Sequence, residues 1–452
     1  MKDIADLLRL VGLPNIDPAI ATTGADPVLP TPFRLGQAGA VMLGAVGIGV
    51  AEIWKRRGGK PQSVGIDLRE AALALRTSSH ITAEGQPPRD VWQPLSGFYQ
   101  AGDGRWIQLH CNFPHHAAGT CKLLGVEQDR RQVEGAIGKW KAEELETALA
   151  AAKMCAAMVR ERAEWQAHPQ GQAVAALPVI TLERVGDGPK QPLGPAARPL
   201  AGLRSLDLTR VIAGPTCGRT LAEHGAEVLL ITSPKLPSIP PLVIDTGFGK
   251  RSTSIDLESR EGADTLRELV KGADIFVQGY RPGGLAERGF GPEALAKLRP
   301  GIISLSLCAY SHAGPWSGRR GYDTLVQCAS GIVAEQTASE KSPKPKHTPA
   351  SALDYLTGYL AAFGILAALL RRAEEGGSWH IRVSLAQTAA WLDRLGRCAP
   401  SAGVPNCDDL MQETASPFGR LRHLRPPLRL AETPPYWASP PVPLGTHPPR
   451  WA

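Results

Sequence analysis

The sequence lacks the motifs that mark metal, redox and dinucleotide sites. Its eight cysteines form no Cys-x-x-Cys pair and its 11 histidines include no His-Glu-x-x-His motif, so neither a zinc site nor a disulfide framework is indicated. The turn at residues 208–215 lacks Gly-x-Gly-x-x-Gly, which excludes the dinucleotide fingerprint. No basic stripe with interleaved aromatics occurs, so nucleic acid is not an expected partner. We expect no metal, reduced thiols and a cytoplasmic protein.

Long apolar runs without charge are also scarce. The longest, residues 38–53, contains Glu52 and is too short to cross a bilayer, so no membrane partner is expected. The first residues form a short amphipathic stretch rather than a signal peptide. The 452-residue chain has 43% hydrophobic residues, 21% charged residues and a formal net charge of +7. This composition excludes disorder of the whole chain, and the modest positive charge suits small anionic ligands.

Residues 27–198 form a helix-rich first part behind a leader, residues 1–26, of uncertain structure. Their pattern predicts an apolar helix that ends in Gly-Gly, then a short strand and a second helix, at 36–57, 63–67 and 68–76. Residues 97–110 alternate around Ala-Gly-Asp-Gly, which predicts a β-hairpin. Helical periodicity follows over 113–167, and the Pro- and Gly-rich stretch 168–202 is expected to be a loop-rich connection.

Residues 199–395 alternate between strand and helix. The expected strands are 205–208, 227–231, 274–277, 302–307 and 380–383, and the expected helices are 216–224, 260–271, 292–298 and 354–372. Such a βαβ series builds a parallel sheet with helices on both faces, so we predict an α/β fold with an open, Rossmann-like parallel sheet and a second, smaller α+β domain. The Pro-rich tail, residues 396–452, is expected to be an extended wrapping segment or a disordered end.

One segment of the chain recurs. Residues 37–72, here called the first copy, align without a gap with residues 354–389, the second copy. Identical pairs include Leu43/Leu360, Gly47/Gly364 and Gly59/Gly376. Any two βα units look alike to this extent, so chance likeness stays an alternative to duplication. The second copy opens with Asp354 where the first has Gln37, so only the second carries a carboxylate at that point.

Several loops next to strands have the residues that hold anions. Ala213-Gly214 precedes a helix whose N-terminus favours negative charge, and Lys250-Arg251 could hold phosphates. Tyr280-Arg281 follows a strand at its carboxyl end, where open α/β sheets bind ligands. Arg319-Arg320 adds further positive charge. Taken singly, each of these loops also fits an ordinary tight turn or a solvated loop.

Asp354 is the acidic residue with the clearest chemical potential. It completes Ser351-Ala-Leu-Asp354, which matches a capping box at the start of an apolar helix. The alternative is a catalytic role, because a carboxylate in the first turn of a helix is kept ionised by the dipole and can act as a nucleophile.

These segments together resemble the class III CoA-transferases, the family of formyl-CoA transferase and carnitine CoA-transferase, which also holds α-methylacyl-CoA racemase. The resemblance rests on LDLTRVIAGPTCGRTLAEHGAEVLLI, GKRSTSIDL, GADIFVQGYRPGGLAERGFG, LRPGIISLSLCAYSHAGPWSGRRGYDTLVQCASG and SALDYLTGYLAAFGILAALLRR, in that order. It implies the class III fold, although the order is rearranged: a half-copy with the small domain precedes the nucleotide-binding half. It also implies a homodimer, in which the subunits could be interlocked.

The resemblance implies a function for individual residues. Asp354 falls on the catalytic aspartate, which attacks an acyl-CoA thioester and goes on to form an aspartyl-CoA intermediate. Coenzyme A would enter as a thioester substrate, with a carboxylic acid as the second substrate and no permanently bound cofactor. Positions that contact CoA in the family fall on Ile212, Ala213, Gly249, Lys250, Arg251, Ser252, Gly279, Tyr280, Arg281, Arg288, Arg320, Tyr322 and Asp323.

Two other functions stay open beside transfer of CoA. An acyl-CoA racemase of the same fold would need an acid/base pair, and this sequence has Tyr322 where the racemases have histidine. Tyrosine, with a pKa near 10, is a poor base at neutral pH, which favours transfer. The Gln37 substitution and the half-copy order would also suit a non-catalytic CoA-binding pseudo-enzyme or partner subunit.

Overall fold

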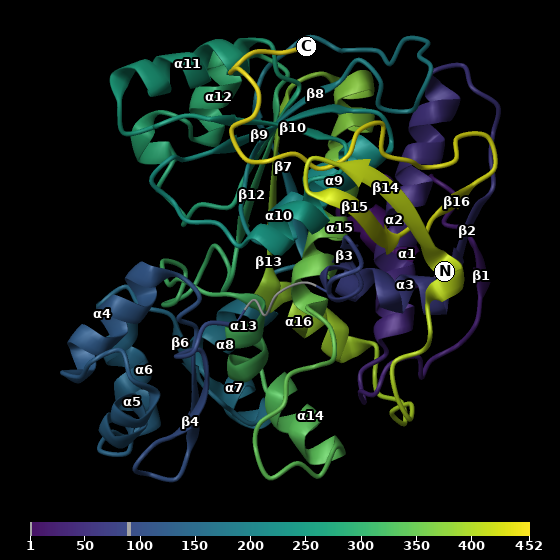
Figure 1. Cartoon of the computed structure of the whole chain (residues 1–452). Helices are drawn as coiled ribbons and strands as arrows, with labels where there is room; N and C mark the ends of the chain where they lie inside the picture. Colours follow the sequence, from purple (N-terminus) through teal and green to yellow (C-terminus); the bar gives the residue numbers. More distant parts are fainter. Residues whose placement is uncertain (1, 88–91) are drawn as a thin grey trace.

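A seven-stranded sheet forms the centre of the computed structural model, which describes residues 2–87 and 92–452 (Figure 1). Its strand order is β10-β9-β8-β11-β12-β13-β7, and all neighbours run parallel except β7, which is antiparallel to β13. The strands are β7 (Ile180–Gly186), β8 (Arg204–Leu208), β9 (Glu227–Thr232), β10 (Lys250–Ser254), β11 (Ile275–Gln278), β12 (Ile303–Cys308) and β13 (Ser378–Ser384). The predicted α/β class with an open parallel sheet is confirmed.

Helices cover both faces of this sheet, as the buried strand sequences require. In β11, Ile275 and Val277 join the core cluster that includes α9 (Ala213–Glu223) and α15 (Ala352–Glu375). Phe276, which points the other way, joins the cluster of α11 (Arg260–Lys271) and α12 (Pro292–Leu298). This alternation along one strand separates the two helical layers.

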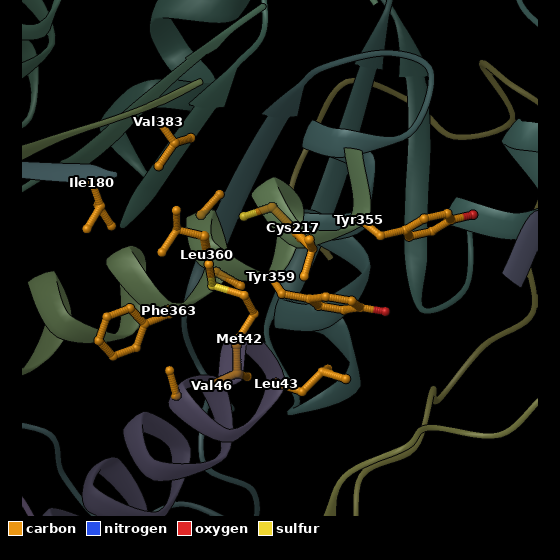
Figure 2. Close-up of a cluster of buried hydrophobic side chains, with 14 of the residues drawn as sticks. Met42, Leu43, Val46, Ile180, Cys217, Tyr355, Tyr359, Leu360, Phe363 and Val383 are labelled. Carbon is orange, nitrogen blue, oxygen red and sulfur yellow. The ribbon is translucent and has the colours of Figure 1, made fainter. Parts of the chain in front are cut away.

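The recurring segment is confirmed as a structural repeat. The first copy forms α2 (Leu35–Arg56), β2 (Val64–Asp67) and α3 (Leu68–Leu73). The second copy forms α15, β13 and α16 (Leu385–Arg394) in the same order, with the helices beginning at aligned positions. The two long helices pack against each other in the core, where α2 contributes Met42, Leu43 and Val46 and α15 contributes Tyr359, Leu360 and Phe363 (Figure 2).

A smaller α+β domain lies between the two copies in sequence, drawn in blue in Figure 1. The expected hairpin forms β4 (Gly97–Gln100) and β5 (Trp106–Leu109), and β6 (Ala156–Met158) completes an antiparallel sheet. The domain has its own apolar core. Its helices are α4 (Pro114–Leu124), α5 (Arg130–Ile137) and α6 (Ala142–Ala151), and α7 (Arg162–Ala167) and α8 (Pro169–Ala175) lead back to the main sheet.

Two segments predicted as loops contain strands. Residues 168–202 are not simply a loop, because Ile180–Gly186 forms β7 and pairs with β13 at the sheet edge. Lys250 and Arg251 lie within strand β10 and not in a loop. The leader, for which the sequence supports no definite prediction, forms helix α1 (Lys2–Leu10) and strand β1 (Ala21–Thr23), which pairs with β2. Residues 88–91 lie outside the described part of the chain.

The Pro-rich tail wraps the molecule as an extended segment, which was one of its two predicted forms. It forms β14 (Met411–Ser416) and β15 (Gly419–Leu424), which pair with β3 (Thr82–Ala83). β16 (Arg429–Leu430) then pairs with β2. The last residues run along the main sheet, where the Trp451 indole donates to Leu269 O in α11. Polar contacts of this kind fix an extended segment that has little helix or sheet of its own.

Helices α2 and α15 are long and apolar enough to cross a membrane by length and composition. Their burial explains that composition: 83% of the apolar window of α2 and 100% of that of α15 lies inside the protein. A helix that is apolar on all sides is expected at the centre of a large core.

Candidate active site

A cavity of about 530 Å³ opens at the carboxyl ends of the parallel strands. Segments that follow β8, β9, β10, β11 and β12 line it, together with Asp354 from α15 and the start of α4 from the small domain. The sheet order changes direction at β8 and β11, and the Gly279 N–H that follows β11 donates to Leu208 O of β8. Open α/β sheets bind their ligands at such a switch point.

The loop from β8 to α9 forms one wall of the cavity, and hydrogen bonds to the side chain of Asp207 fix its start. The Asp207 carboxylate accepts from the Thr209 backbone N–H at 3.1 Å and from the Thr209 hydroxyl. Val211 in this loop has φ +73°, in the left-handed region that is costly for a β-branched residue. A strained residue therefore lies at the wall of the cavity.

Asp354 reaches the cavity because α15 packs closely on the start of α9. One turn after Asp354, a side chain at Gly358 would place Cβ 2.5 Å from Ala213 O and 2.7 Å from Thr216 Cβ. Glycine is thus required for the two helices to approach at this point. The approach brings Asp354, which is 8% exposed, to the same cavity as Ala213 and the β8–α9 loop.

The N-terminus of α15 is capped by Asp323 and not by the predicted box. Ser351 makes no side-chain capping bond, so the capping-box interpretation is wrong. The Asp323 carboxylate instead accepts from the backbone N–H groups of Leu353 and Asp354, the latter at 3.0 Å. Two carboxylates are therefore held together in a buried place.

This neighbour also changes the ionisation of Asp354. Burial, together with the adjacent charge of Asp323, raises the pKa of Asp354 well above its usual range. Burial raises the pKa of Asp323 as well, while its backbone hydrogen bonds lower it. Desolvation and the charge of Asp323 therefore oppose the ionisation of Asp354 that the helix dipole favours.

Tyr322 lies beside the pair and stacks on a ring of the small domain. Its ring centroid is 3.7 Å from that of His110, at an interplanar angle of 7°. Burial raises the pKa of Tyr322 above its usual value of 10 and lowers the pKa of His110 to about 3. Both groups are therefore neutral at physiological pH.

The start of helix α4 supplies residues that sequence reasoning missed. His116 is 2% exposed and lines the cavity with Phe113 and His115. Its Nε2 lies 3.4 Å from Arg320 Nη1, so it accepts from that guanidinium, and its Nδ1 has no partner among the described residues. The signal in the sequence was Pro114-His115-His116 directly after the hairpin.

The cavity is lined mainly by positive charge. Six lining residues are Arg or Lys, against three that are Asp or Glu: Arg210, Lys235, Arg281, Arg288, Arg319 and Arg320, against Asp256, Glu258 and Asp354. At the outer end Lys235 pairs with Glu258 at 2.7 Å, and Arg288 donates to Leu257 O at 2.8 Å. An anionic ligand would gain from this excess, with the guanidinium groups suited to phosphate.

The structure brings together eight of the residues singled out from the sequence. These cavity residues are Ala213, Gly279, Tyr280, Arg281, Arg288, Arg320, Tyr322 and Asp354. Asp323 lies directly behind Asp354, and Ile212 is buried at the N-cap of α9. Arg210, from the turn at residues 208–215, also lines the cavity, although the sequence did not predict this.

Residues 249–252 are not brought to the cavity. Lys250 Nζ is buried and donates to Asp207 Oδ2 at 2.8 Å and to Pro215 O at 2.7 Å. Arg251 pairs with Glu227 at 3.2 Å, and the Ser252 N–H donates to His447 in the tail at 3.2 Å. Gly249 has φ +73° and packs on Trp437. In this structure Lys250 supports the β8–α9 loop from inside.

The described residues, 2–87 and 92–452, contain no group of three or more His, Cys, Asp or Glu that could hold a metal ion. The side chains at the cavity are a buried carboxylate at a helix N-terminus, neutral rings beside it and cations around it.

Comparison with known proteins places the chain in a family. The sequence profile of CoA-transferase family III matches residues 18–192 and 200–396. The chain is 28% identical to the acetyl-coenzyme A transferase nodX of Hypoxylon pulicicidum, over 86% of this chain and 75% of that protein. It is 32% identical to the succinate–glutarate CoA-transferase of Agrobacterium fabrum, over 50% of this chain and 65% of that protein.

A crystal structure of a CAIB/BAIF family protein from Brucella suis is 26% identical and has a TM-score of 0.40, covering 50% of this chain and 65% of that chain. The chain thus spans about two thirds of the length of two of these relatives. Because the family profile covers both parts of the sequence, the chain belongs to CoA-transferase family III.

Proposed function

We propose that the protein transfers coenzyme A from an acyl-CoA thioester to a carboxylic acid, with Asp354 as the nucleophile. The observation that carries this proposal is the position of Asp354. It is a buried carboxylate at the N-terminus of α15, in a cavity lined by cations at the carboxyl ends of the sheet. A nucleotide-linked thioester is an anion with one electrophilic carbon, so it needs these two features together.

The proposed reaction proceeds through covalent steps on Asp354. A carboxylate oxygen attacks the thioester carbonyl and the C–S bond breaks, giving an acyl–aspartyl anhydride and CoA thiolate. The thiolate attacks the aspartyl carbonyl, which releases the donor acid and leaves an aspartyl-CoA thioester. The acceptor carboxylate attacks that thioester, giving a second anhydride and the thiolate again. The thiolate then attacks the acceptor's own carbonyl and regenerates Asp354.

Other groups in the cavity support these steps. The helix N-terminus favours the ionised form of Asp354 and the developing negative charge of each tetrahedral intermediate. His116, which also lines the cavity, keeps a buried Nδ1 that has no partner among the described residues. CoA thiolate that stays bound between the steps of transfer needs no proton, whereas racemisation needs an acid/base pair. Tyr322 and His110 are both neutral, which fits transfer better than racemisation.

Intact-mass spectrometry tests the proposal directly. The protein is incubated with a panel of acyl-CoA thioesters without an acceptor and quenched quickly. We expect an adduct of the mass of CoA, less water, on a peptide that contains Asp354, and none with Asp354→Ala. An active Asp354→Ala variant would overturn the assignment. If CoA binds without an adduct, α-proton exchange in deuterated water decides between a racemase and a non-catalytic CoA-binding protein.

A further inference from the structure

The two copies are related to each other as two subunits would be. Gly49 of α2 and Leu366 of α15 occupy aligned positions, and a Cβ on Gly49 would lie 3.0 Å from Leu366 Cβ. Figure 2 shows the two helices facing each other through aligned sets of residues, with Met42, Leu43 and Val46 of α2 on one side and Tyr359, Leu360 and Phe363 of α15 on the other. Equivalent residues contact each other only where a two-fold axis relates two surfaces.

Each copy is also completed by a strand that the chain supplies from elsewhere. In the second copy, β13 has a parallel neighbour, β12, and an antiparallel one, β7, which comes from the segment after the small domain. In the first copy, β2 has a parallel neighbour, β1, and an antiparallel one, β16, which comes from the tail. The three-stranded sheet β1-β2-β16 thus repeats the edge β12-β13-β7.

The packing around the exchanged strands is also the same in the two copies. A Cβ on Gly364 would meet Ile381 of β13 at 3.0 Å and Ile180 of β7 at 2.7 Å. A Cβ on the aligned Gly47 would meet Val64 of β2 at 2.5 Å and Leu428, beside β16, at 3.2 Å. Each copy therefore packs its glycine on its own strand and on a strand from the other part of the chain.

Only one of the two helix N-termini faces a nucleotide-binding half. In the first copy the Asp26 carboxylate accepts from the Gly36 and Gln37 N–H groups at 3.0 and 2.8 Å, as Asp323 does for α15. The sheet of the first copy has β1 alone on the side where the second copy has β12, β11, β8, β9 and β10. The only small domain among the described residues, 2–87 and 92–452, follows the first copy and places His116 in the cavity of the second.

We infer that this chain is an internal pseudo-dimer: it closes the strand exchange of two copies within itself and carries one composite site, for which the first copy supplies the small domain and the second the nucleophile. The helix start at Gln37 keeps its cap for folding and has no chemistry. A second chain is not needed to complete the site. This inference rests on the proposed function only for what the site does.

Cleavage of the folded full chain tests the strand exchange without an activity assay. A site for a specific protease is inserted between the exposed residues Gly194 and Pro195. After cleavage we expect both pieces to stay in one native particle and to separate only in denaturant, because β7 and β16 bind them to each other. Pieces that separate under native conditions would overturn the inference.

Mixing variants tests whether the site forms within one chain. Asp354→Ala and His116→Ala are co-expressed and assayed for the CoA adduct. A site within one chain gives no more adduct than the sum of the two variants alone, whereas recovery of a quarter or more of wild-type adduct would overturn the inference. The Asp354→Ala/Gln37→Asp double variant should form no adduct. If wild-type protein forms none either, the proposed function fails while the cleavage result still decides the inference.

Discussion

The Asp323 Oδ2 atom accepts a hydrogen bond from the backbone N–H of Asp354, at 3.0 Å. This bond gives Asp323 two effects on its neighbour. It anchors the first turn of α15 and so fixes where the Asp354 carboxylate lies, and it keeps a second carboxylate beside the proposed nucleophile. The first effect favours catalysis by positioning, and the second opposes ionisation.

The pH dependence of transfer should report this pair. Asp354 attacks only when ionised, and its pKa is raised, so the rate of adduct formation should rise with pH from below the pKa of Asp354 to above it. Asp323→Asn removes the adjacent charge and keeps one acceptor for the helix, so the rise should move to lower pH. Single-turnover mass spectrometry across pH measures both profiles. A profile that Asp323→Asn leaves in place would contradict the coupling.

Removing the charge of Asp354 should stabilise the fold while abolishing transfer. A raised folded-state pKa means that the folded protein binds the proton more tightly than the unfolded chain, so stability is lost as pH rises from the unfolded-state pKa through the folded-state pKa. Each unit of elevation costs about 1.4 kcal/mol of unfolding free energy above both values.

Asp354→Asn has no such cost. We therefore expect a higher unfolding free energy than wild type at pH 8 and a smaller difference near pH 4, measured by urea denaturation. Asp264→Asn, on the exposed face of α11, is the matched control. It should change the unfolding free energy little at either pH. An Asp354→Asn protein less stable than wild type at pH 8 would contradict the direction of the shift.

The sequence predicted the fold better than it predicted the site. Strand and helix alternation identified the βαβ core because those strands are buried runs and the helices keep their periodicity. It failed for β7, because Pro and Gly surround that strand and its partner β13 lies about 200 residues away. Contacts over such a separation leave no local signal, and the same holds for the exchange of β16.

The site residues show the same limit. Asp354 and the loop at Tyr280 could be placed from motifs at strand and helix ends, whereas His116 reaches the cavity only through the position of the small domain. Lys250 has the composition of a phosphate ligand, yet it lies beneath the loop and pairs with Asp207. The sequence pattern identifies the chemistry of a residue, but the direction in which its side chain points depends on packing.

Lys250 and Arg281 should therefore respond differently to mutation. Lys250→Met leaves the Asp207 carboxylate buried without its partner, which costs about 3–5 kcal/mol of unfolding free energy. Arg281→Ala changes an exposed residue that lines the cavity, so stability should hold while CoA binds more weakly by a factor of about 10. Urea denaturation and calorimetric titration with CoA separate the two effects. An unchanged stability of Lys250→Met would show that Lys250 is not a structural group.

The close approach of α15 to α9 makes the strictest prediction. In Gly358→Ala the new Cβ would lie 2.5 Å from Ala213 O, so one of the two helices must move. A displacement of about 1 Å at Asp354 is enough to reduce the rate of adduct formation about 100-fold. Rapid-quench mass spectrometry measures this rate at saturating acyl-CoA.

Gly135→Ala provides the matched control. Gly135 is also helical, in α5, and nothing lies within 4 Å of its added Cβ. Helix propensity then stabilises the protein by about 0.5–1 kcal/mol without a change in rate. If Gly358→Ala also kept its rate, Asp354 would not depend on the contact with Ala213, and the position of α15 on α9 would have no part in catalysis.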